Sequence, residues 1–157
     1  MIRNFILWLA LTFSFGGFTF YAAVVVPVGT EVLDSTSQGF VTRQVTKVLN
    51  IASAITLGFL IWEILATYRT VKRKWLWSYL GLLLVYSGCL LGLFLLHPRL
   101  DELLDAETFS VLQSEEFYRR HRLYLWLSTL QWLTTIGIMW QITSRSAKSI
   151  HQNVQPT

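Results

Sequence analysis

Long apolar stretches separated by short polar segments organise this chain. Four of these stretches carry one formal charge or none, and they cover residues 4–30, 48–68, 75–97 and 123–144. A helix needs roughly 20 apolar residues to cross a hydrocarbon core about 30 Å thick. The pattern therefore predicts an all-α integral membrane protein. We expect a four-transmembrane-helix bundle with spans at about residues 4–28, 46–68, 75–97 and 118–143.

The polar connections predict the remaining elements. Residues 27–39 are rich in glycine, serine and threonine, which favours a loop. Pro98 is expected to end the third span, because proline lacks the backbone N–H that a helix interior needs. Apolar residues between Leu100 and Leu112 recur at helical spacing, so we expect a short interfacial helix between spans 3 and 4. The polar tail, residues 146–157, is expected to be loose.

The composition leaves no room for a second domain. The chain has 157 residues, and the four spans take up more than half of it. Charged residues make up 14%, against about 25% in a typical soluble domain. The net charge of +4 comes from basic residues near the span ends, which argues against a nucleic-acid partner. We therefore expect one membrane domain over residues 1–157.

The connection between the second and third spans is strongly basic. Its six residues hold four cations and no acid, namely Arg69, Lys72, Arg73 and Lys74. Short cytoplasmic loops are enriched in lysine and arginine, so this loop predicts the cytoplasmic side. With an even number of spans, both termini then lie in the cytoplasm. The topology suits a bacterial inner membrane, and the basic loop suits anionic lipid headgroups as a partner.

The few polar residues within the spans fall on defined helix faces. In the last span they recur every three or four residues and lie within about 80° of arc: His121, Tyr124, Ser128, Gln131 and Thr135. Polar groups facing lipid are unfavourable, so this stripe should face the bundle interior. One interpretation is a ligand-binding groove that opens outward near His97, Tyr118 and His121. The alternative is hydrogen bonding between helices, worth about 0.6 kcal/mol per contact.

Glu63 is the acid that lies within a predicted span. A carboxylate inside the membrane is a candidate for a proton or cation site. It lies about five residues from the predicted cytoplasmic end, so an ion pair with Arg69 or Lys72 is the alternative. Both interpretations stay open at the level of sequence.

A metal site is a further hypothesis. Two imidazoles and a carboxylate can hold zinc, copper or iron, and the sequence offers His97, His121 and Asp101 near the outer span ends. No His-x-x-x-His pair, second cysteine or methionine cluster accompanies them. The cofactor therefore stays undetermined between none, a metal and a haem. No catalytic residue is predicted, because the serines in the spans lack a placed base.

Small residues in the spans predict close helix packing. Gly88 and Gly92 form a Gly-x-x-x-Gly pattern in the third span. Such notches allow helices to approach closely, either within one chain or between copies. We therefore expect tight internal contacts here, or a homo- or hetero-oligomer formed through this face.

The start of the last span carries a recognisable pattern. It reads Phe117-Tyr-Arg-Arg-His121-Arg-Leu-Tyr124, with a phenylalanine four residues before a histidine. This pattern resembles a family of small four-span membrane proteins of unknown function that includes the eukaryotic transmembrane protein linked to cisplatin resistance. Further points of similarity are Gly16-Gly17, Pro27 and Pro98, and a departure is the basic cluster of Arg119, Arg120 and Arg122. The resemblance implies four spans and no particular activity.

Three functional hypotheses follow from these patterns. The first is a non-enzymatic multi-pass membrane protein that handles a small solute, ion or metal through an outward polar groove. Its candidate binding residues are His97, His121, Tyr118, Tyr124, Ser128, Gln131 and Glu63. The second is an accessory or scaffold subunit of a larger membrane complex. The third is a membrane redox or haem-binding protein.

Overall fold

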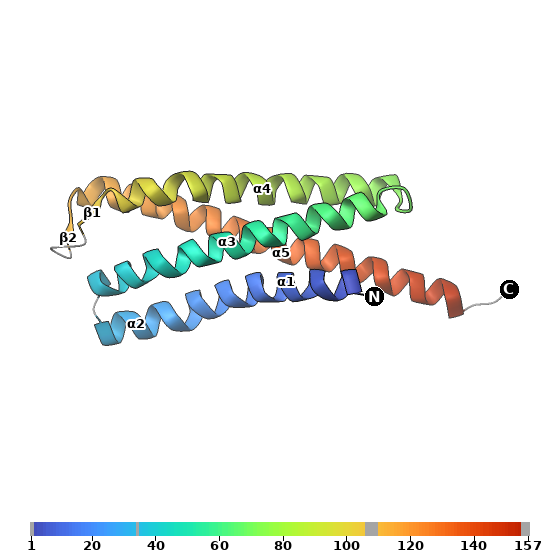
Figure 1. The fold of residues 1–157 in the computed structure, drawn as a ribbon, viewed down its shortest axis with the longest axis horizontal. Helices are drawn as coiled ribbons and strands as arrows, with labels where there is room; N and C mark the ends of the chain where they lie inside the picture. The colour runs from blue at the N-terminus through green and yellow to red at the C-terminus, as the bar shows by residue number, and fades with distance from the viewer. Residues whose placement is uncertain (1, 34, 106–109, 155–157) are drawn as a thin grey trace.

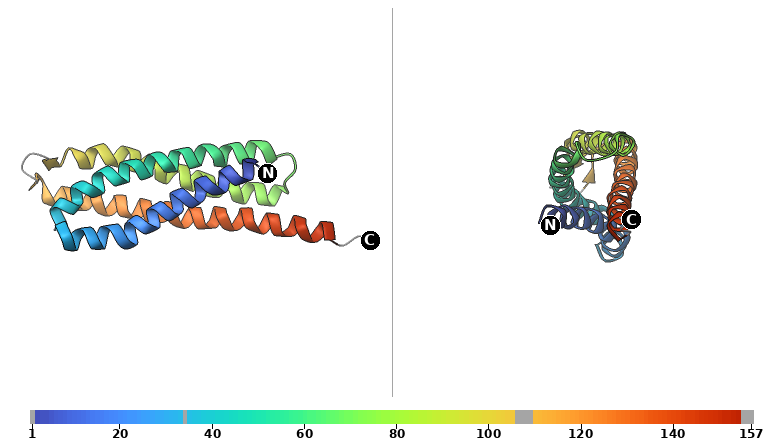
Figure 2. Two further views of the ribbon diagram at one scale, coloured as in Figure 1. Left: turned by 60° about the horizontal axis from the view of Figure 1, so that its bottom comes forward. Right: turned by 90° about the vertical axis from the view of Figure 1, so that its right-hand side faces the viewer.

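The computed structural model describes residues 2–33, 35–105 and 110–154, and the side chains of these except for residues 35–36, 110 and 146–154. Its elements are α1 (Ile2–Phe20), a π-helix η1 (Tyr21–Val25), α2 (Val26–Leu33), α3 (Ser35–Thr67), α4 (Arg73–Asp101), β1 (Leu104–Asp105), β2 (Ser110–Val111) and α5 (Ser114–Val154). α1, η1 and α2 join into one rod, which packs on α3 and less closely on α5 (Figure 1). Seen end-on, the rods stand around a common axis (Figure 2).

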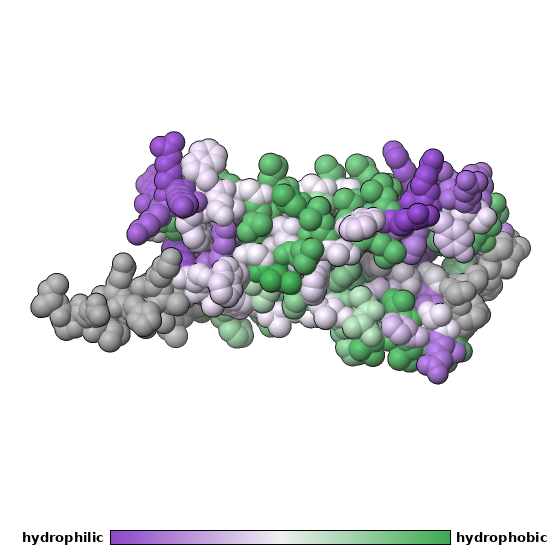
Figure 3. All heavy atoms as spheres, turned by 180° about the vertical axis from the view of Figure 1, so that it is seen from behind, coloured by the Kyte–Doolittle hydropathy of each residue, from purple (hydrophilic) through white to green (hydrophobic). Residues whose placement is uncertain are grey.

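The described residues are helical apart from the loop between α3 and α4 and a short hairpin near residues 104–111, and they have the features of an integral membrane protein. Three helical segments are long and apolar enough to cross a bilayer, namely Ile2–Leu33, Ser37–Thr67 and Arg73–Asp101. On the face seen in the space-filling view, apolar side chains predominate across the middle of the bundle and hydrophilic side chains gather towards both ends (Figure 3). The predicted helical class is therefore confirmed, and these three segments have the length and apolar composition of membrane spans.

The two ends of the bundle differ. The N-terminus, the loop between α3 and α4 and the C-terminal part of α5 lie at one end, which we call the termini end (Figure 1). The connection between α2 and α3 and the β1–β2 hairpin lie at the other, which we call the hairpin end (Figure 1).

The long helices pack in two main pairs. α5 packs mainly on α4, and α1 packs mainly on α3. α1 and α5 touch each other much less, so the seam between them is looser than these two packed pairs.

The loop predicted over residues 27–39 is wrong. Helix continues through Pro27 to Leu33, and α3 begins at Ser35. Proline removes one helical hydrogen bond and clashes with the carbonyl four residues earlier, which normally ends or kinks a helix. Here the π-helix η1 directly precedes Val26 and widens the backbone at that place. This local widening explains how the rod accommodates Pro27.

The connection between α4 and α5 is a hairpin where the sequence predicted an interfacial helix. α4 continues through Pro98 to Asp101, and β1 then pairs antiparallel with β2. A short separate helix is only marginally stable because its nucleation is unfavourable. The hairpin instead buries Leu103, whose carbonyl accepts a hydrogen bond from Leu112 N–H at 3.0 Å. The prediction is therefore not met in the described residues of this connection.

Apolar packing fills the half of the bundle nearer the termini end. The core side chains come from all the rods and are Leu7, Leu11, Leu60, Ile64, Tyr79, Tyr86, Leu90 and Ile138. α5 stays helical through Val154, so it runs beyond the predicted span end at residue 143 and into the tail that was expected to be loose. Extending an existing helix by one residue is easier than starting a new one, which accounts for this continuation. Buried polar residues lie on both sides of this core, with Gln38, Asn50 and Ser128 towards the hairpin end and Glu63 and Thr67 towards the termini end.

Candidate functional site

A cavity of about 270 Å³ lies at the hairpin end, and we call it the outer cavity. Its walls combine side chains from α2, α3, α4, the hairpin and α5. They are Val26, Thr30, Gln38, Gly39, Thr42, Arg43, Thr46, His97, Leu100, Asp101, Leu104, Val111, Phe117, Tyr118, His121 and Tyr124. The sequence had predicted a groove near His97, Tyr118 and His121, and all three line this cavity.

An ion pair and a histidine form one wall of the outer cavity. Arg43 Nε lies 2.7 Å from Asp101 Oδ1, which ties α3 to the end of α4. His97 Nδ1 lies 3.4 Å from Asp101 Oδ2, and His97 Nε2 lies 3.1 Å from the backbone oxygen of Arg43. Both groups that face the imidazole are acceptors, and a neutral ring donates to one of them, according to its tautomer. Arg43 and Asp101 neutralise each other, which leaves this wall without a strong net charge.

Aromatic rings form the opposite wall. His121 stacks flat on Phe117, with the ring centroids 5.7 Å apart and 9° between the planes. The Tyr118 side chain is 60% exposed, which places it at the mouth of the outer cavity. Tyr124 is buried, and its ring meets His97 edge-on at a centroid distance of 6.5 Å. This wall offers a ring-shaped ligand a flat stacking surface together with hydroxyl and imidazole groups.

Gln38 is a buried amide in the wall of the outer cavity. It is 3% exposed, and among the residues that the structure describes neither its Oε1 nor its Nε2 has a hydrogen-bond partner. Gly29 makes this position possible, since a Cβ at Gly29 would overlap the Gln38 carboxamide. An unpaired buried amide is unfavourable by about 1–3 kcal/mol, so a group that enters the cavity and pairs with Gln38 would gain that energy.

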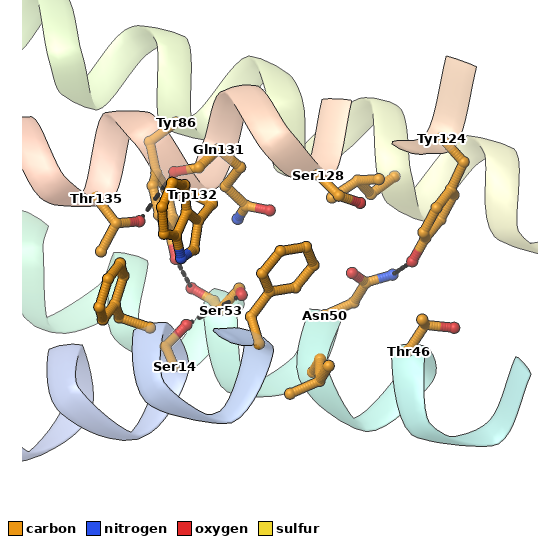
Figure 4. A pocket seen from close by; sticks show the side chains of 14 residues that line it. Ser14, Thr46, Asn50, Ser53, Tyr86, Tyr124, Ser128, Gln131, Trp132 and Thr135 are labelled. Atoms are coloured by element: carbon orange, nitrogen blue, oxygen red, sulfur yellow. Dashed lines mark hydrogen bonds between the residues drawn. The ribbon is translucent and has the colours of Figure 1, made fainter. Parts of the chain in front are cut away.

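A second, smaller cavity lies deeper in the bundle, and we call it the inner chamber (Figure 4). Its volume is about 30 Å³, and Thr46 and Tyr124 line both it and the outer cavity. The other polar residues around it are Ser14, Asn50, Ser53, Tyr86, Ser128, Gln131, Trp132 and Thr135. Asn50 Nδ2 donates to Tyr124 Oη at 3.0 Å, so this buried pair stands between the two spaces (Figure 4).

The inner chamber is polar enough to hold water. Ser14 Oγ and Ser53 Oγ lie 3.2 Å apart, and Tyr86 Oη donates to the Ser53 backbone oxygen at 3.1 Å (Figure 4). Gln131 Nε2 is buried and has no hydrogen-bond partner in the described part of the chain. A buried water needs about 10–15 Å³ of such space and two to four polar partners. The chamber therefore has room for about two waters, one of which can accept from Gln131.

Glu63 lies apart from both cavities, near the termini end. Its carboxylate faces Arg3, whose Nε is 2.8 Å from Oε2, and Arg145, whose Nη1 is 3.5 Å from Oε1. Glu63 therefore forms ion pairs, as the alternative interpretation predicted, but its partners are Arg3 and Arg145 and not Arg69 or Lys72. The prediction chose the cations that follow Glu63 most closely in the sequence, whereas the fold brings α1 and α5 to it.

The metal hypothesis finds no support in the geometry. Among the described residues, no group of three histidine, cysteine, aspartate or glutamate side chains is placed to hold a metal ion. His97 and Asp101 are neighbours, but the two ring nitrogens of His97 already face the Asp101 carboxylate and the Arg43 backbone oxygen. His121 instead stacks on Phe117. The predicted set of His97, His121 and Asp101 is not brought together as a ligand set.

The predicted stripe of the last span lies inward as expected. Tyr124, Ser128, Gln131 and Thr135 are all buried. The sequence analysis missed the α3 residues that line the two cavities, Gln38, Arg43, Thr46 and Asn50. Residues 27–39 had been assigned to a loop, so the helical register of early α3 could not be used. A run of polar residues every three or four positions, from Gln38 to Asn50, was the available signal.

The two glycines of the Gly-x-x-x-Gly pattern have different surroundings. A Cβ at Gly92 would come 2.8 Å from Leu127 Cδ1, so this glycine admits α5 closely. A Cβ at Gly88 would meet nothing within 4 Å. The predicted tight internal contact therefore belongs to Gly92. Gly88 lies on the outer surface of α4, where the predicted oligomer would have to form.

Comparison of the chain with protein-family models, with curated proteins and with solved structures found no match. Function is therefore inferred from the cavities, the buried polar groups and the apolar surface of the chain itself.

Proposed function

We propose that this chain is a four-span, non-enzymatic membrane protein that binds a small ring-containing solute in the outer cavity. The observation that carries the proposal is the cavity of about 270 Å³, where an aromatic wall faces a polar wall. Pockets of this kind, mostly apolar with a few placed polar groups, are typical of small-molecule sites. The binding face opens at the hairpin end, away from both termini.

The fourth span is α5. Its sequence is less apolar than the other spans because its middle holds Ser128, Gln131, Thr134 and Thr135, and all of these are buried in the bundle. The residues that α5 exposes in the same stretch are mainly apolar, such as Leu125, Leu130 and Leu133. A bilayer meets only the exposed surface, so a helix with this arrangement suits lipid although its mean hydropathy is lower.

The orientation places the termini end in the cytoplasm of a bacterial inner membrane. The basic loop from Arg69 to Lys74 is at that end, and its four cations are exposed. Cytoplasmic loops of inner-membrane proteins carry such an excess of lysine and arginine. The outer cavity then opens on the opposite side of the membrane.

The ligand that fits these walls is a small planar ring with at least one hydrogen-bonding group. A ring can stack beside His121 and Phe117, which are already parallel. Tyr118 and Gln38 supply polar partners, and the paired charges of Arg43 and Asp101 favour a neutral molecule over an ion. The apolar core beyond the inner chamber closes the path, so binding rather than open conduction is supported.

Ligand-detected NMR on the purified protein tests this function. The probes are phenol and benzamide, with cyclohexanol as a probe of similar size that cannot stack. We expect saturation transfer to both aromatic probes and much less to cyclohexanol. His121→Ala should remove most of the transfer, whereas Trp126→Ala, on the exposed surface of α5, should leave it unchanged. Equal transfer to all three probes, or equal loss in both variants, would contradict the proposal.

A further inference from the structure

A further polar space lies at the termini end, and we call it the termini-end cleft. It has a volume of about 210 Å³. Its polar and aromatic lining residues are Arg3, Asn4, Trp8, Glu63, Trp75 and Arg145. These residues come from α1, α3, α4 and α5, and the cleft lies at the loosely packed seam between α1 and α5.

The cleft holds two cations against one anion. Glu63 is 6% exposed, whereas the side chains of Arg3 and Arg145 are 37% and 36% exposed. Arg3 Nε lies 2.8 Å from Glu63 Oε2 without the alignment of a hydrogen bond. The buried carboxylate therefore holds both guanidinium groups in place, and the three groups together carry one positive charge.

The guanidinium groups keep donors for a further acceptor. Each guanidinium has five N–H donors, and its planar fork matches the oxygens of a phosphate. Glu63 faces Nε of Arg3 and Nη1 of Arg145. Arg145 also lies over the ring of Trp75, 5.3 Å from its centroid, which restricts how the group can turn. Two oriented guanidinium groups at one cleft are a suitable arrangement for a single phosphate group.

The position of the cleft points to a lipid rather than to a soluble anion. Trp8 and Trp75 line it, and tryptophan is enriched at the level of the lipid headgroups. On α1, Ile2, Phe5 and Leu9 are exposed and provide apolar surface for acyl chains. The exposed cations of the loop between α3 and α4 add a positive field at the same end.

We propose that the termini-end cleft binds the phosphate of an anionic phospholipid headgroup through Arg3 and Arg145, with Glu63 as the positioning residue. The bound lipid would close the seam between α1 and α5. This site is independent of the outer cavity at the other end, so the failure of either proposal leaves the other standing.

Thermal unfolding of the purified full-length protein in neutral detergent tests the proposal. The additives are short-chain phosphatidylglycerol, short-chain phosphatidylcholine and inorganic phosphate. We expect phosphatidylglycerol to raise the Tm in a saturable manner and the other two additives to have little effect. Inorganic phosphate raising the Tm equally would assign the cleft to a soluble anion, and equal effects of both lipids would overturn the phosphate site.

Variants then assign the effect to the cleft. Arg3→Gln and Arg145→Gln should each weaken the apparent affinity for phosphatidylglycerol about tenfold, as expected for one lost charge-assisted hydrogen bond. Because either change leaves Glu63 poorly paired, the triple variant R3Q/E63Q/R145Q removes all three charges and should fold without the lipid preference. The control is Arg73→Gln in the exposed loop, which should keep the preference. A triple variant that still prefers phosphatidylglycerol would overturn the proposal.

Discussion

Tyr124→Phe removes the hydroxyl that stands between the outer cavity and the inner chamber. In the wild type, Asn50 Nδ2 donates to Tyr124 Oη at 3.0 Å, and the two residues are 5% and 6% exposed. The bond joins residues 74 positions apart in the chain and connects α3 with α5. Its loss therefore weakens a contact between two helices rather than within one.

The magnitude follows from burial and from the space nearby. Leaving a buried donor unpaired is unfavourable by about 1–3 kcal/mol in soluble proteins, whereas coupling between polar pairs in membrane helices averages about 0.6 and reaches about 1.7 kcal/mol. The inner chamber has room for about two waters, which can replace part of the lost bond. We therefore expect Tyr124→Phe to destabilise the protein by about 1 kcal/mol, with a coupling energy to Asn50 of about 0.6–1.5 kcal/mol.

The assay is a double-mutant cycle with Tyr124→Phe and Asn50→Ala, measured by reversible unfolding in mixed micelles. The control is Tyr118→Phe, which removes the hydroxyl of an exposed tyrosine on the same helix and should change stability by less than about 0.5 kcal/mol. A coupling energy near zero would refute the bond between α3 and α5. If Tyr118→Phe lowers the free energy of unfolding as much as Tyr124→Phe does, burial of the hydroxyl does not decide the loss of stability.

Three other substitutions test separate parts of the structure. Gln38→Met should stabilise the ligand-free protein by about 1 kcal/mol, because it removes two unpaired buried atoms, and it should weaken solute binding. The control in the unfolding assay is Gln44→Met, at an exposed position on the same helix. If Gln38→Met destabilises the protein, the amide is already paired. Gly92→Val should destabilise the protein by about 1–3 kcal/mol through overlap with Leu127, whereas Gly88→Val should leave the stability of the monomer nearly unchanged. If light scattering shows a change of oligomeric state in Gly88→Val alone, an interface lies on that face. Hydrogen bonds from Arg120 and then Arg119 hold the pKa of Glu116 below its ordinary value of 4.5. The carboxylate therefore stabilises the fold above pH 4.5, and this contribution is lost as the pH falls through the lowered pKa. Glu116→Gln should remove this acid-dependent loss from a pH series of unfolding curves, and an unchanged pH dependence would contradict the pairing.

The inward stripe of the last span could be predicted because burial follows helical periodicity. Tyr124, Ser128 and Gln131 recur at spacings of three or four, and lipid excludes such groups from the outer surface. The meeting of His97 with the last span followed from the same reasoning, since antiparallel neighbouring helices bring their connected ends together. Local pattern and the membrane were sufficient for this part.

Contacts that depend on non-local geometry could not be predicted. Pro27 reads as a helix end, and only the π-helix before it lets the rod continue to Leu33. That error hid the start of α3 and therefore Arg43, whose ion pair with Asp101 forms one wall of the outer cavity. Glu63 likewise has two cations next in the chain, yet its partners are Arg3 and Arg145. Sequence spacing carries no information on which distant segments a bundle brings together.

The outward-facing cavity is tested most directly by cysteine labelling in intact cells. In a Cys89→Ala background, which removes the single native cysteine, a membrane-impermeant maleimide is applied to the variants Tyr118→Cys and Lys72→Cys. The account predicts that Tyr118→Cys reacts in intact cells and is protected by an aromatic probe such as benzamide, whereas Lys72→Cys reacts only after the cells are opened. Labelling of Lys72→Cys in intact cells, with Tyr118→Cys silent, would contradict it.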